Sequence, residues 1–257
     1  MRPAVLVIAG SDSSGGAGLT RDVQVLTHFG VDALCAVTAV TAQSNSGVRA
    51  VHPVPAESIR AQIEMALATA PIGAVKIGML GRREAVEIVA QSLPSRARVP
   101  IVLDPVLASS SGAVLLDDAG QDAMLRQLFP RVTLVTPNVP EAAVLLHEAV
   151  AGSESAVTKQ ARRLFALGPQ AVLIKGGHAG GSQSVDVLVT AQDSVERLNA
   201  QRLDASARGT GCAMASAIAA GLASGLSLPA ACVQAKQHVL DLLTRSPRPG
   251  EHQIESA

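Results

Sequence analysis

The segment most suggestive of chemistry is Gly209-Thr210-Gly211-Cys212, which runs directly into a helix-like stretch of small residues. Glycine lets the backbone turn tightly and approach a ligand closely. The start of a helix carries unpaired N–H groups and a positive dipole end, so it suits phosphate and would stabilise a Cys212 thiolate. Taken alone, the segment is better explained by a turn into a buried alanine-rich helix, with Cys212 as a core residue. The rest of the chain reverses that preference.

A second glycine-rich segment covers residues 10–18, after the first apolar run, and opens a helical stretch. It is a candidate anion or substrate loop, although it lacks both the G-x-G-x-x-G spacing of dinucleotide folds and the Lys-Ser/Thr ending of a P-loop. The alternative is a flexible strand-to-helix connection. Asp22, one turn into that helix, is by itself better explained as a charge near the helix start.

Three oxygen-bearing side chains follow two later apolar runs. Asp104 comes directly after residues 101–103, and Asn138 and Glu141 follow residues 133–135. Two carboxylates and an amide suit Mg²⁺, which usually keeps several waters and bridges to substrate phosphates. A favourable charge at a helix start explains Glu141 equally well by itself, and a capped turn explains Asp104. Together the three residues favour a magnesium site.

Several further residues are ambiguous at this stage. Lys175, Gly176 and Gly177 could bring backbone close to a nucleotide, or could form a plain turn with a solvated His178. Lys236 is expected to be a solvated charge unless its helix packs over the phosphate site. Cys35, within a strand, and Cys232, within an apolar helix, are both predicted to be core residues.

The elements that must position these residues alternate between short apolar runs and helical patterns. Residues 59, 63, 66 and 67 show the spacing of an amphipathic helix, as do residues 157, 161, 164 and 165. Apolar strands separated by helices predict a largely parallel sheet covered on both faces. In such sheets ligands bind beyond the carboxyl ends of the strands, where the polar residues named above cluster. The expected parallel strands are residues 4–9, 33–41, 74–77, 101–103, 133–135 and 171–174. Residues 185–189 and 195–203 are expected to form a hairpin.

Composition limits the class of protein. The 257 residues suit one α/β domain over residues 1–245, followed by a polar, frayed tail over 246–257. Lys plus Arg balance Asp plus Glu at 21 each, and Trp and Tyr are absent, so nothing favours a nucleic acid partner. Three widely spaced cysteines exclude a full disulfide framework and indicate a reducing compartment such as the cytoplasm.

Two apolar stretches could be mistaken for membrane or targeting segments. Arg2 followed by residues 4–9 loosely imitates a signal peptide, but polar residues follow at once, so a buried first strand is the better interpretation. Residues 209–235 carry no charge and are long enough to span a bilayer. Because Pro229 interrupts them, two helices with a turn at residues 225–229 fit better, and no membrane partner is expected.

Taken together and in order, these motifs resemble the hydroxymethylpyrimidine/phosphomethylpyrimidine kinases of thiamine biosynthesis, within the ribokinase-like superfamily. The resemblance runs from about Val5 to Lys236. Sugar kinases of the superfamily usually carry Asp where this chain has Cys212. The segments that carry the resemblance are residues 9–18, 38–43, 76–79, 104–106, 136–138 with 141–142, 174–178 and 209–212.

The resemblance implies a ribokinase-like three-layer α/β/α sandwich with a mostly parallel central sheet, ATP and Mg²⁺ as cofactors, and a homodimer. It implies that the pyrimidine contacts Gly10, Asp22, Gln43 and Met79, with Val106 nearby. Gly209, Thr210, Gly211 and Cys212 would form the anion hole, with Cys212 closest to the reacting hydroxyl. Asp104 and Glu141, joined by Asn138, would support Mg²⁺. The expected nucleotide side consists of Lys175, Gly177, Arg208 and Lys236.

The chain departs from the family pattern at three places, which mark a divergent member. Arg208 stands where the family usually has His, Ser110 where it usually has Lys, and Thr20-Arg21 where it usually has Gln-Ala. The expected reaction is ATP-dependent phosphorylation of 4-amino-5-hydroxymethyl-2-methylpyrimidine and of its monophosphate. The alternatives are a kinase for pyridoxal or a related hydroxymethyl heterocycle, and a catalytically silent metabolite-binding protein. Retention of Asp104, Glu141 and Cys212 argues against the silent protein.

Overall fold

The short apolar runs form the strands of one sheet. The computed structural model describes residues 2–44, 47–109, 111–177, 182–191, 194–203, 205 and 207–245. The described strands form one nine-stranded sheet in the order β3-β2-β1-β4-β5-β6-β7-β8-β9. Their bounds are β1 Ala4–Asp12, β2 Asp32–Ser44, β3 Gly47–Pro53, β4 Ala74–Ile77, β5 Ile101–Leu103, β6 Leu134–Val135, β7 Val172–Ile174, β8 Gln183–Ala191 and β9 Ser194–Gln201.

The centre of the sheet is parallel and its two ends are antiparallel. β2, β1, β4, β5, β6 and β7 run in one direction. β3 pairs antiparallel with β2, and β8 pairs antiparallel with both β7 and β9. The mostly parallel sheet and the β8–β9 hairpin are therefore confirmed. β3 was not predicted, and β1 extends to Asp12, beyond the expected end at residue 9.

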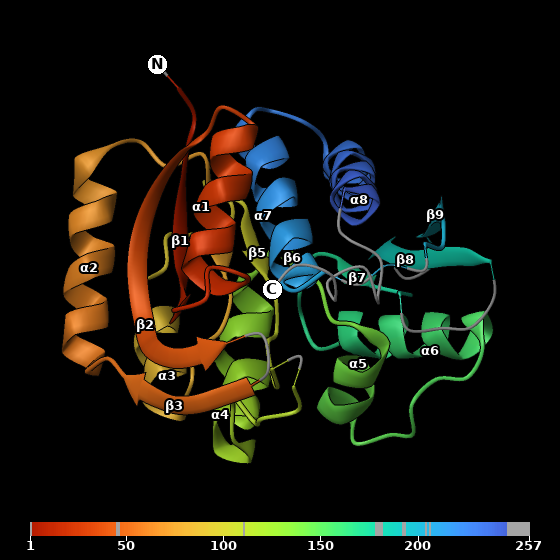
Figure 1. Cartoon of the computed structure of the whole chain (residues 1–257), viewed down its shortest axis with the longest axis horizontal. Helices are drawn as coiled ribbons and strands as arrows, with labels where there is room; N and C mark the ends of the chain where they lie inside the picture. The colour runs from red at the N-terminus through yellow and green to blue at the C-terminus, as the bar shows by residue number, and fades with distance from the viewer. Residues whose placement is uncertain are drawn as a thin grey trace, which may run out of the picture.

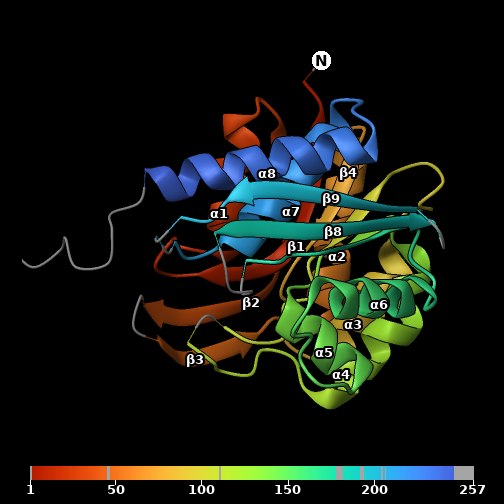
Figure 2. The same ribbon diagram turned by 90° about the vertical axis from the view of Figure 1, so that its right-hand side faces the viewer.

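Helices cover both faces of the sheet, as Figures 1 and 2 show. In Figure 2, α1, α7 and α8 lie on one side, and α3 to α6 lie on the other. This is the three-layer α/β/α arrangement that was expected. The helix bounds are α1 Gly18–His28, α2 Ala56–Thr69, α3 Arg83–Ser92, α4 Asp118–Ala123, α5 Val139–Leu146, α6 Glu154–Phe165, α7 Thr210–Ala223 and α8 Leu228–Thr244. A π-helical segment, Met124–Leu128, and a 3-10 turn, Phe129–Arg131, follow α4.

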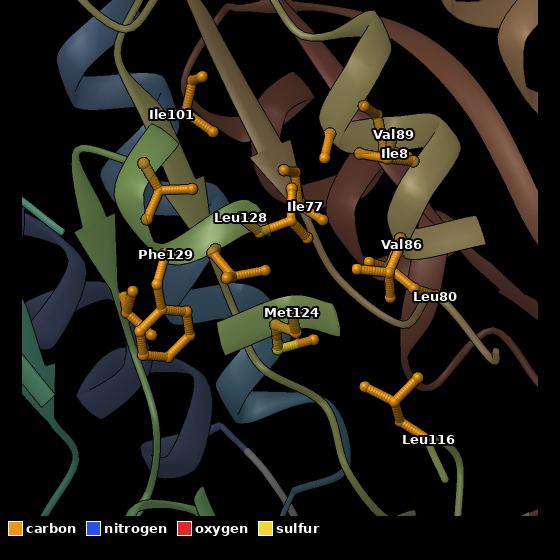
Figure 3. Close-up of a cluster of buried hydrophobic side chains, with 14 of the residues drawn as sticks. Ile8, Ile77, Leu80, Val86, Val89, Ile101, Leu116, Met124, Leu128 and Phe129 are labelled. Carbon is orange, nitrogen blue, oxygen red and sulfur yellow. The ribbon is translucent and has the colours of Figure 1, made fainter. Parts of the chain in front are cut away.

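Each face of the sheet has its own hydrophobic core. The larger core is built from bulky side chains under α2 to α6, with Ile8 and Ile77 from the strands and Phe129 from the 3-10 turn (Figure 3). The other core lies under α1, α7 and α8 and is rich in alanine, with Val7 and Met214 among its larger members. Small residues let α7 pack close to the strands, because an added side chain needs added separation.

The structure separates the uncharged stretch of residues 209–235 into two helices, as expected. α7 ends at Ala223 and α8 begins at Leu228, with Gly225 in the left-handed region (φ 87°) between them. Across the described residues, no helix combines the length and apolarity needed to cross a membrane. Ser110, His178 and the predicted tail over 246–257 lie outside the described residues.

One prediction about the core is wrong. Cys232 is fully buried in α8, but Cys35 is exposed on β2. β3 pairs only with the later part of β2, from Ala39 onward. Cys35 therefore lies where one edge of β2 is not covered by a neighbouring strand. There the side-chain amide of Gln62 completes the backbone hydrogen bonds of Val37.

Candidate active site

A cavity of about 750 Å³ opens at the carboxyl ends of the parallel strands. It extends from the glycine-rich segment after β1 to the start of α7 and the β8–β9 hairpin. All the predicted site residues line it except Asp22. They are Gly10, Gln43, Met79, Asp104, Val106, Asn138, Glu141, Lys175, Gly177, Arg208, Gly209, Thr210, Gly211, Cys212 and Lys236.

The two glycine-rich segments meet backbone to backbone. Gly209 precedes α7 with φ 72°, and a Cβ atom there would lie 2.3 Å from the carbonyl oxygen of Gly16. Gly18 has φ 58°, and its Cβ would lie 2.4 Å from the carbonyl oxygen of Gly10. L-residues rarely adopt this conformation, and here a side chain would also collide. The first turn of α7 is thus held against the loop that follows β1, with its N–H groups at the cavity.

Cys212 lies in that first turn and lines the cavity. Burial raises the pKa of its thiol to about 11, and the nearby carboxylates of Asp22 and Asp104 also raise it. The Lys76 ammonium and the Gly18 amide act in the opposite direction. The thiol is therefore protonated at neutral pH, so a role as proton acceptor requires further stabilisation of the thiolate.

Asp104 is nearly buried beside α7 and is paired with a cation. Its Oδ1 atom accepts hydrogen bonds from Lys175 Nζ at 2.8 Å and from Thr136 Oγ1 at 3.2 Å. Lys175 Nζ lies 3.1 Å from the position of a Cβ on Gly211. The ammonium is therefore set against the anion-binding turn. Burial lowers the pKa of Lys175, but Asp104 and Glu141 outweigh that effect and raise it, so the cation persists.

Glu141 and Asn138 form a capping box at the start of α5. Asn138 Oδ1 accepts from the Glu141 amide at 2.8 Å, and Glu141 Oε2 accepts from the Asn138 amide at 2.7 Å. The helix-start explanation of Glu141 is therefore realised, and its side chain faces the cavity as well. Burial and the Asp104 charge raise the pKa of Glu141 to about 7, although Lys175 opposes the rise.

The donor set at this edge suits a magnesium ion that also binds phosphate. Within the described ranges, no three His, Cys, Asp or Glu side chains cluster as they would around a metal held by protein alone. Mg²⁺ commonly takes one or two carboxylates, several waters and substrate phosphates. Asp104 Oδ2 and Glu141 Oε1 accept no hydrogen bond from any described residue, so both retain a donor atom. The Asp104 charge is one of the causes that raise the pKa of Glu141, after burial, and a divalent cation between the two carboxylates would relieve this repulsion.

The opposite end of the cavity is partly apolar. Met79, Val106 and Leu115 pack together there with Ala39. Met79 Sδ lies 2.9 Å from where a Cβ on Gly10 would be, so this position favours glycine. Gln43 lines the same end. A polar amide beside apolar walls is suited to a flat heterocycle with polar edges.

Asp22 does not line this cavity. It is 0 % exposed, and its carboxylate is bound by Lys76 Nζ at 2.7 Å and by Ser216 Oγ at 2.8 Å. The structure therefore gives no direct path from Asp22 to a ligand. Its link to the cavity runs through Lys76, which does line it.

Arg208 joins the two glycine-rich segments instead of facing solvent. Its Nη2 atom lies 3.2 Å from Asp12 Oδ2, and its Nη1 atom donates to Ser14 Oγ at 2.8 Å and to the Ser44 carbonyl at 2.9 Å. Its side chain is only 22 % exposed. It lines the cavity as predicted, and in the described geometry its guanidinium is bound to the loop after β1.

Lys236 meets the second of the two expectations for it, since it lines the cavity and is not a solvated charge. Its Nζ atom lies 2.9 Å from Asp186 Oδ2 and donates to Ser184 Oγ at 3.1 Å. Asp186 also accepts from the Gly176 amide at 2.8 Å. α8 therefore packs across this end of the cavity. A Cβ on Gly176 would lie 1.8 Å from the Val185 carbonyl oxygen, which explains the glycine there.

Sequence reasoning gave no individual role to four charged or polar residues that hold the site together. Asp12 and Asp186 are the partners of Arg208 and Lys236, and Lys76 and Ser216 bind Asp22. For Lys76 a signal existed: it is the only charged residue in the buried strand β4. The other partners lie far apart in the sequence, so no local pattern joins them.

The mostly parallel sheet, with helices on both faces and a cavity at the strand ends, matches the fold of ribokinase-like kinases. Two solved structures have this fold and are kinases. Phosphomethylpyrimidine kinase from Clostridium difficile is 32 % identical, with a TM-score of 0.81, covering 94 % of this chain and 99 % of that chain. Pyridoxal kinase from Staphylococcus aureus, in complex with AMP-PCP and pyridoxal, is 29 % identical, with a TM-score of 0.87, covering 98 % of this chain and 91 % of that chain.

The family follows from the sequence comparison. The model of the family described as phosphomethylpyrimidine kinase matches residues 12–256, and the chain belongs to that family. A hydroxymethylpyrimidine/phosphomethylpyrimidine kinase from Rhizobium meliloti is 40 % identical over 240 residues, covering 93 % of this chain and 90 % of the relative. The resemblance drawn from the motifs is confirmed.

Proposed function

We propose that the chain transfers the γ-phosphoryl group of ATP to the hydroxymethyl oxygen of 4-amino-5-hydroxymethyl-2-methylpyrimidine, and then phosphorylates the resulting monophosphate, in thiamine biosynthesis. The observation that carries the proposal is the single cavity that joins the Gln43–Met79 end to the first turn of α7. One end suits a polar-edged heterocycle and the other suits phosphate. The family and the relatives named above support the same reaction.

The residues of the cavity divide the work of the transfer. Gln43, Met79 and Val106 orient the pyrimidine, and the amides of residues 209–212 stabilise charge on the moving phosphoryl group. Phosphoryl transfer depends mainly on such positioning and electrostatic stabilisation. Lys175 and Lys236 face the nucleotide side and neutralise phosphate charge there. Cys212 is the proposed acceptor of the hydroxyl proton.

Asp104, Glu141 and Asn138 are the proposed holders of Mg²⁺. When bound, the ion would neutralise the phosphates of the leaving nucleotide. Within the protein, Asp104 also fixes Lys175 at 2.8 Å, which orients the ammonium toward the start of α7. The Asp104 carboxylate would thus bind both the Lys175 ammonium and Mg²⁺.

The proposal is tested by incubating the protein with ATP, magnesium and the pyrimidine, and by resolving the products by mass. We expect the monophosphate first and the diphosphate later, with ADP formed in equal amount to the phosphate transferred. Absence of both phosphorylated pyrimidines, with the protein folded and ATP bound, would contradict the proposal. Accumulation of monophosphate alone would remove the second step.

A kinase for pyridoxal is the second candidate function, favoured by the structural similarity to the pyridoxal kinase of Staphylococcus aureus. Pyridoxal also presents a hydroxymethyl group on a flat heterocycle. A competition assay with both alcohols in one reaction distinguishes them, because a shared site forces the two products to reflect the ratio of kcat/KM values. We expect phosphorylated pyrimidine to predominate; predominance of pyridoxal phosphate would favour the second candidate.

We propose that the protein acts as a homodimer in the cytoplasm. The family resemblance supports the dimer, and the three free cysteines Cys35, Cys212 and Cys232 support a reducing compartment. Light scattering coupled to size exclusion measures the mass directly. A mass near twice 26.2 kDa is expected, and a monomer at working concentrations would contradict the dimer.

A further inference from the structure

Arg208 joins three segments of the chain at one side of the cavity, and the roles proposed above do not use it. It directly precedes Gly209, the residue at which the chain turns into α7. Its guanidinium reaches Asp12 at the end of β1, Ser14 in the loop that follows, and Ser44 at the end of β2. These partners lie 164 to 196 residues away in the sequence, so only the fold brings them together.

The guanidinium is held both by charge and by its shape. Its Nη2 atom lies 3.2 Å from Asp12 Oδ2, on a side chain that is only 4 % exposed. Although burial raises the pKa of Asp12, the hydrogen bonds from Ser14 and the Arg208 charge lower it overall, so the carboxylate is ionised at neutral pH. Nη1 donates to Ser14 Oγ at 2.8 Å and to the Ser44 carbonyl oxygen at 2.9 Å. A planar fork can bind partners in several directions at once, which a lysine cannot do in the same way.

The same loop holds the pyrimidine end of the cavity. Ser13 Oγ donates to the carbonyl oxygen of Gln43 at 2.7 Å and accepts from the Gln43 amide at 2.9 Å. Ser44, whose carbonyl oxygen binds Arg208, is the next residue along β2. The backbone at Gln43 is therefore fixed twice, by Ser13 directly and by Arg208 through Ser44.

The phosphate end of the cavity meets the same loop. The turn at Gly209 lies against the Gly16 carbonyl, as described above, and Arg208 packs beside this contact. A Cβ on Gly16 would lie 3.5 Å from both Cβ and Nη1 of Arg208. Arg208 thus lies at the junction between the segment that carries Gln43 and the turn whose N–H groups face the cavity.

We propose that Arg208 is a positioning residue for phosphoryl transfer: with its three partners it forms a clamp that fixes the Gln43 end of the cavity relative to the anion-binding turn of residues 209–212. The inference rests on the proposed function. The clamp keeps the hydroxymethyl oxygen of a pyrimidine bound beside Gln43 close to the phosphoryl group at the turn. Arg208 itself takes no part in the bond changes. Loosening the clamp therefore slows the transfer while each ligand still binds, since a misplacement of about 1 Å can cost on the order of 10²-fold in rate.

The kinetic test compares Arg208→Gln and Arg208→Lys with the unmodified protein. Arg83→Gln is the matched control, because Arg83 also pairs with a carboxylate, that of Glu87, but on the exposed surface of α3. The measured quantities are kcat and KM for the pyrimidine. Calorimetry with AMP-PCP counts the nucleotide sites, so that kcat is expressed per competent site. A merely structural role would reduce the number of sites or the melting temperature and leave kcat per site unchanged.

Arg208→Gln should lower kcat per site roughly 10- to 100-fold, with little change in the pyrimidine KM or in AMP-PCP affinity. Arg208→Lys should fall between this variant and the parent, because lysine keeps the charge opposite Asp12 but loses the fork. Arg83→Gln should keep the parental kcat. A parental kcat in Arg208→Gln overturns the inference, and so does a raised pyrimidine KM with kcat unchanged, which would make Arg208 a binding residue instead.

Asp12→Asn tests whether the two charges act as one unit. The double variant with Arg208→Gln should lose no more kcat than the more damaged single variant, because both changes open the same clamp. Losses that multiply would show two independent roles and overturn the inference. If Asp12→Asn does not fold, as judged by circular dichroism and thermal melts, the order of kcat among the parent, Arg208→Lys and Arg208→Gln decides the question.

Hydrogen exchange without ATP or pyrimidine tests the clamp independently of the reaction. Peptides that contain residues 12–18, 43–44 and 209–212 should exchange faster in Arg208→Gln than in the parent, and should not change in Arg83→Gln. Unchanged exchange in all three segments overturns the inference, even if pyrimidine phosphorylation by the parent is intact. Failure of the proposed function shows differently, as a parent protein that forms no phosphorylated pyrimidine, and the exchange rates then decide alone whether the clamp exists.

Discussion

The two faces of the central sheet are built from the same strands but perform different tasks. On β4, Val75 and Ile77 enter the core under α2 to α6, whereas Ala74 and Lys76 point toward α1 and α7. The first core is formed mainly by large aliphatic side chains, together with Phe129 (Figure 3). The second combines small residues with buried charges. Successive side chains of a strand point to opposite faces of the sheet. Neighbouring residues of β4 therefore serve different tasks: one packs in the aliphatic core, and the next faces the side that carries the site.

The small residues of the second face explain how the site is assembled. α7 contributes Ala213, Ala215 and Ala217 to the core. At its far end, a Cβ on Gly73 would lie 3.0 Å from the Cβ of Ala223. This close packing brings the first turn of α7 to the carboxyl ends of the strands, where phosphate is expected. On the other face, under α2 to α6, the described residues form no network of buried charges like that of Asp22, Lys76 and Ser216.

The largest expected effect falls on the small-residue face. Cys212→Ala should reduce turnover by roughly 10²–10⁴, the usual contribution of a positioned general base. Single-turnover phosphoryl transfer measures the effect, with thermal melts and ATP binding as controls for folding. Cys212→Asp, which imitates the sugar-kinase arrangement, should retain more activity than the alanine variant. Transfer at the parental rate by Cys212→Ala would leave the cysteine a packing role only.

The second largest effect on turnover is expected from the two carboxylates at the strand ends, Asp104 and Glu141. Asp104→Asn and Glu141→Gln should each lower turnover roughly 10²-fold, because charge neutralisation of the phosphates is worth several kcal/mol. A magnesium titration of the rate is the measurement, and we expect both variants to need more magnesium than the parent. Parental rates in both variants across the titration would show that the metal assignment is wrong.

A smaller effect is expected at the substrate end. Gln43→Leu removes an amide that can pair with ring nitrogen or amino edges, at a cost of roughly 1–3 kcal/mol in kcat/KM for the pyrimidine. ATP binding should not change, which provides an internal control by calorimetry. Unchanged KM and kcat for the pyrimidine would exclude Gln43 from recognition.

The smallest effect tests the aliphatic face. Ile77→Val deletes one buried methylene and should cost about 0.5–1.5 kcal/mol of unfolding free energy. Turnover should remain at the parental value, since Ile77 points away from the cavity. Denaturant unfolding and single-turnover kinetics of the same preparation give both numbers. If the loss of turnover, expressed as activation free energy, exceeded the loss of unfolding free energy, the assignment of stability to this face and of chemistry to the other would be contradicted.

Fully buried elements could be predicted from sequence because their composition is unambiguous. The expected bounds of β4 and β5 agree with the structure, since every residue in them is buried between two layers of helices. The edge strand β3 was missed because its residues are partly exposed and lack an apolar run. Cys35 was assigned to the core because an edge cannot be recognised before the pairing of strands is known.

The residues of the candidate site could be predicted where they lie at strand ends or are glycines in tight turns, and not where they depend on pairing between distant charges. Gly209 was recognised from the tight turn that it allows before the helix, and Cys212 from its place at the start of that helix once the other motifs were taken together. The partners of Lys76 and Arg208, by contrast, lie 54 and 196 residues away, in Asp22 and Asp12. Only the folded sheet brings these charges together. A lysine within an apolar strand indicates that a partner must exist but does not identify it.

The central claim is that one cavity couples a bound pyrimidine alcohol to cleavage of ATP. The most direct measurement is the rate of ADP formation by the unmodified protein with magnesium and ATP, in the presence and absence of the pyrimidine. The account predicts ADP formation that requires the pyrimidine and equals the phosphorylated product in amount. Tight binding of both ligands with no pyrimidine-dependent ADP would contradict it and indicate a metabolite-binding protein on a kinase scaffold.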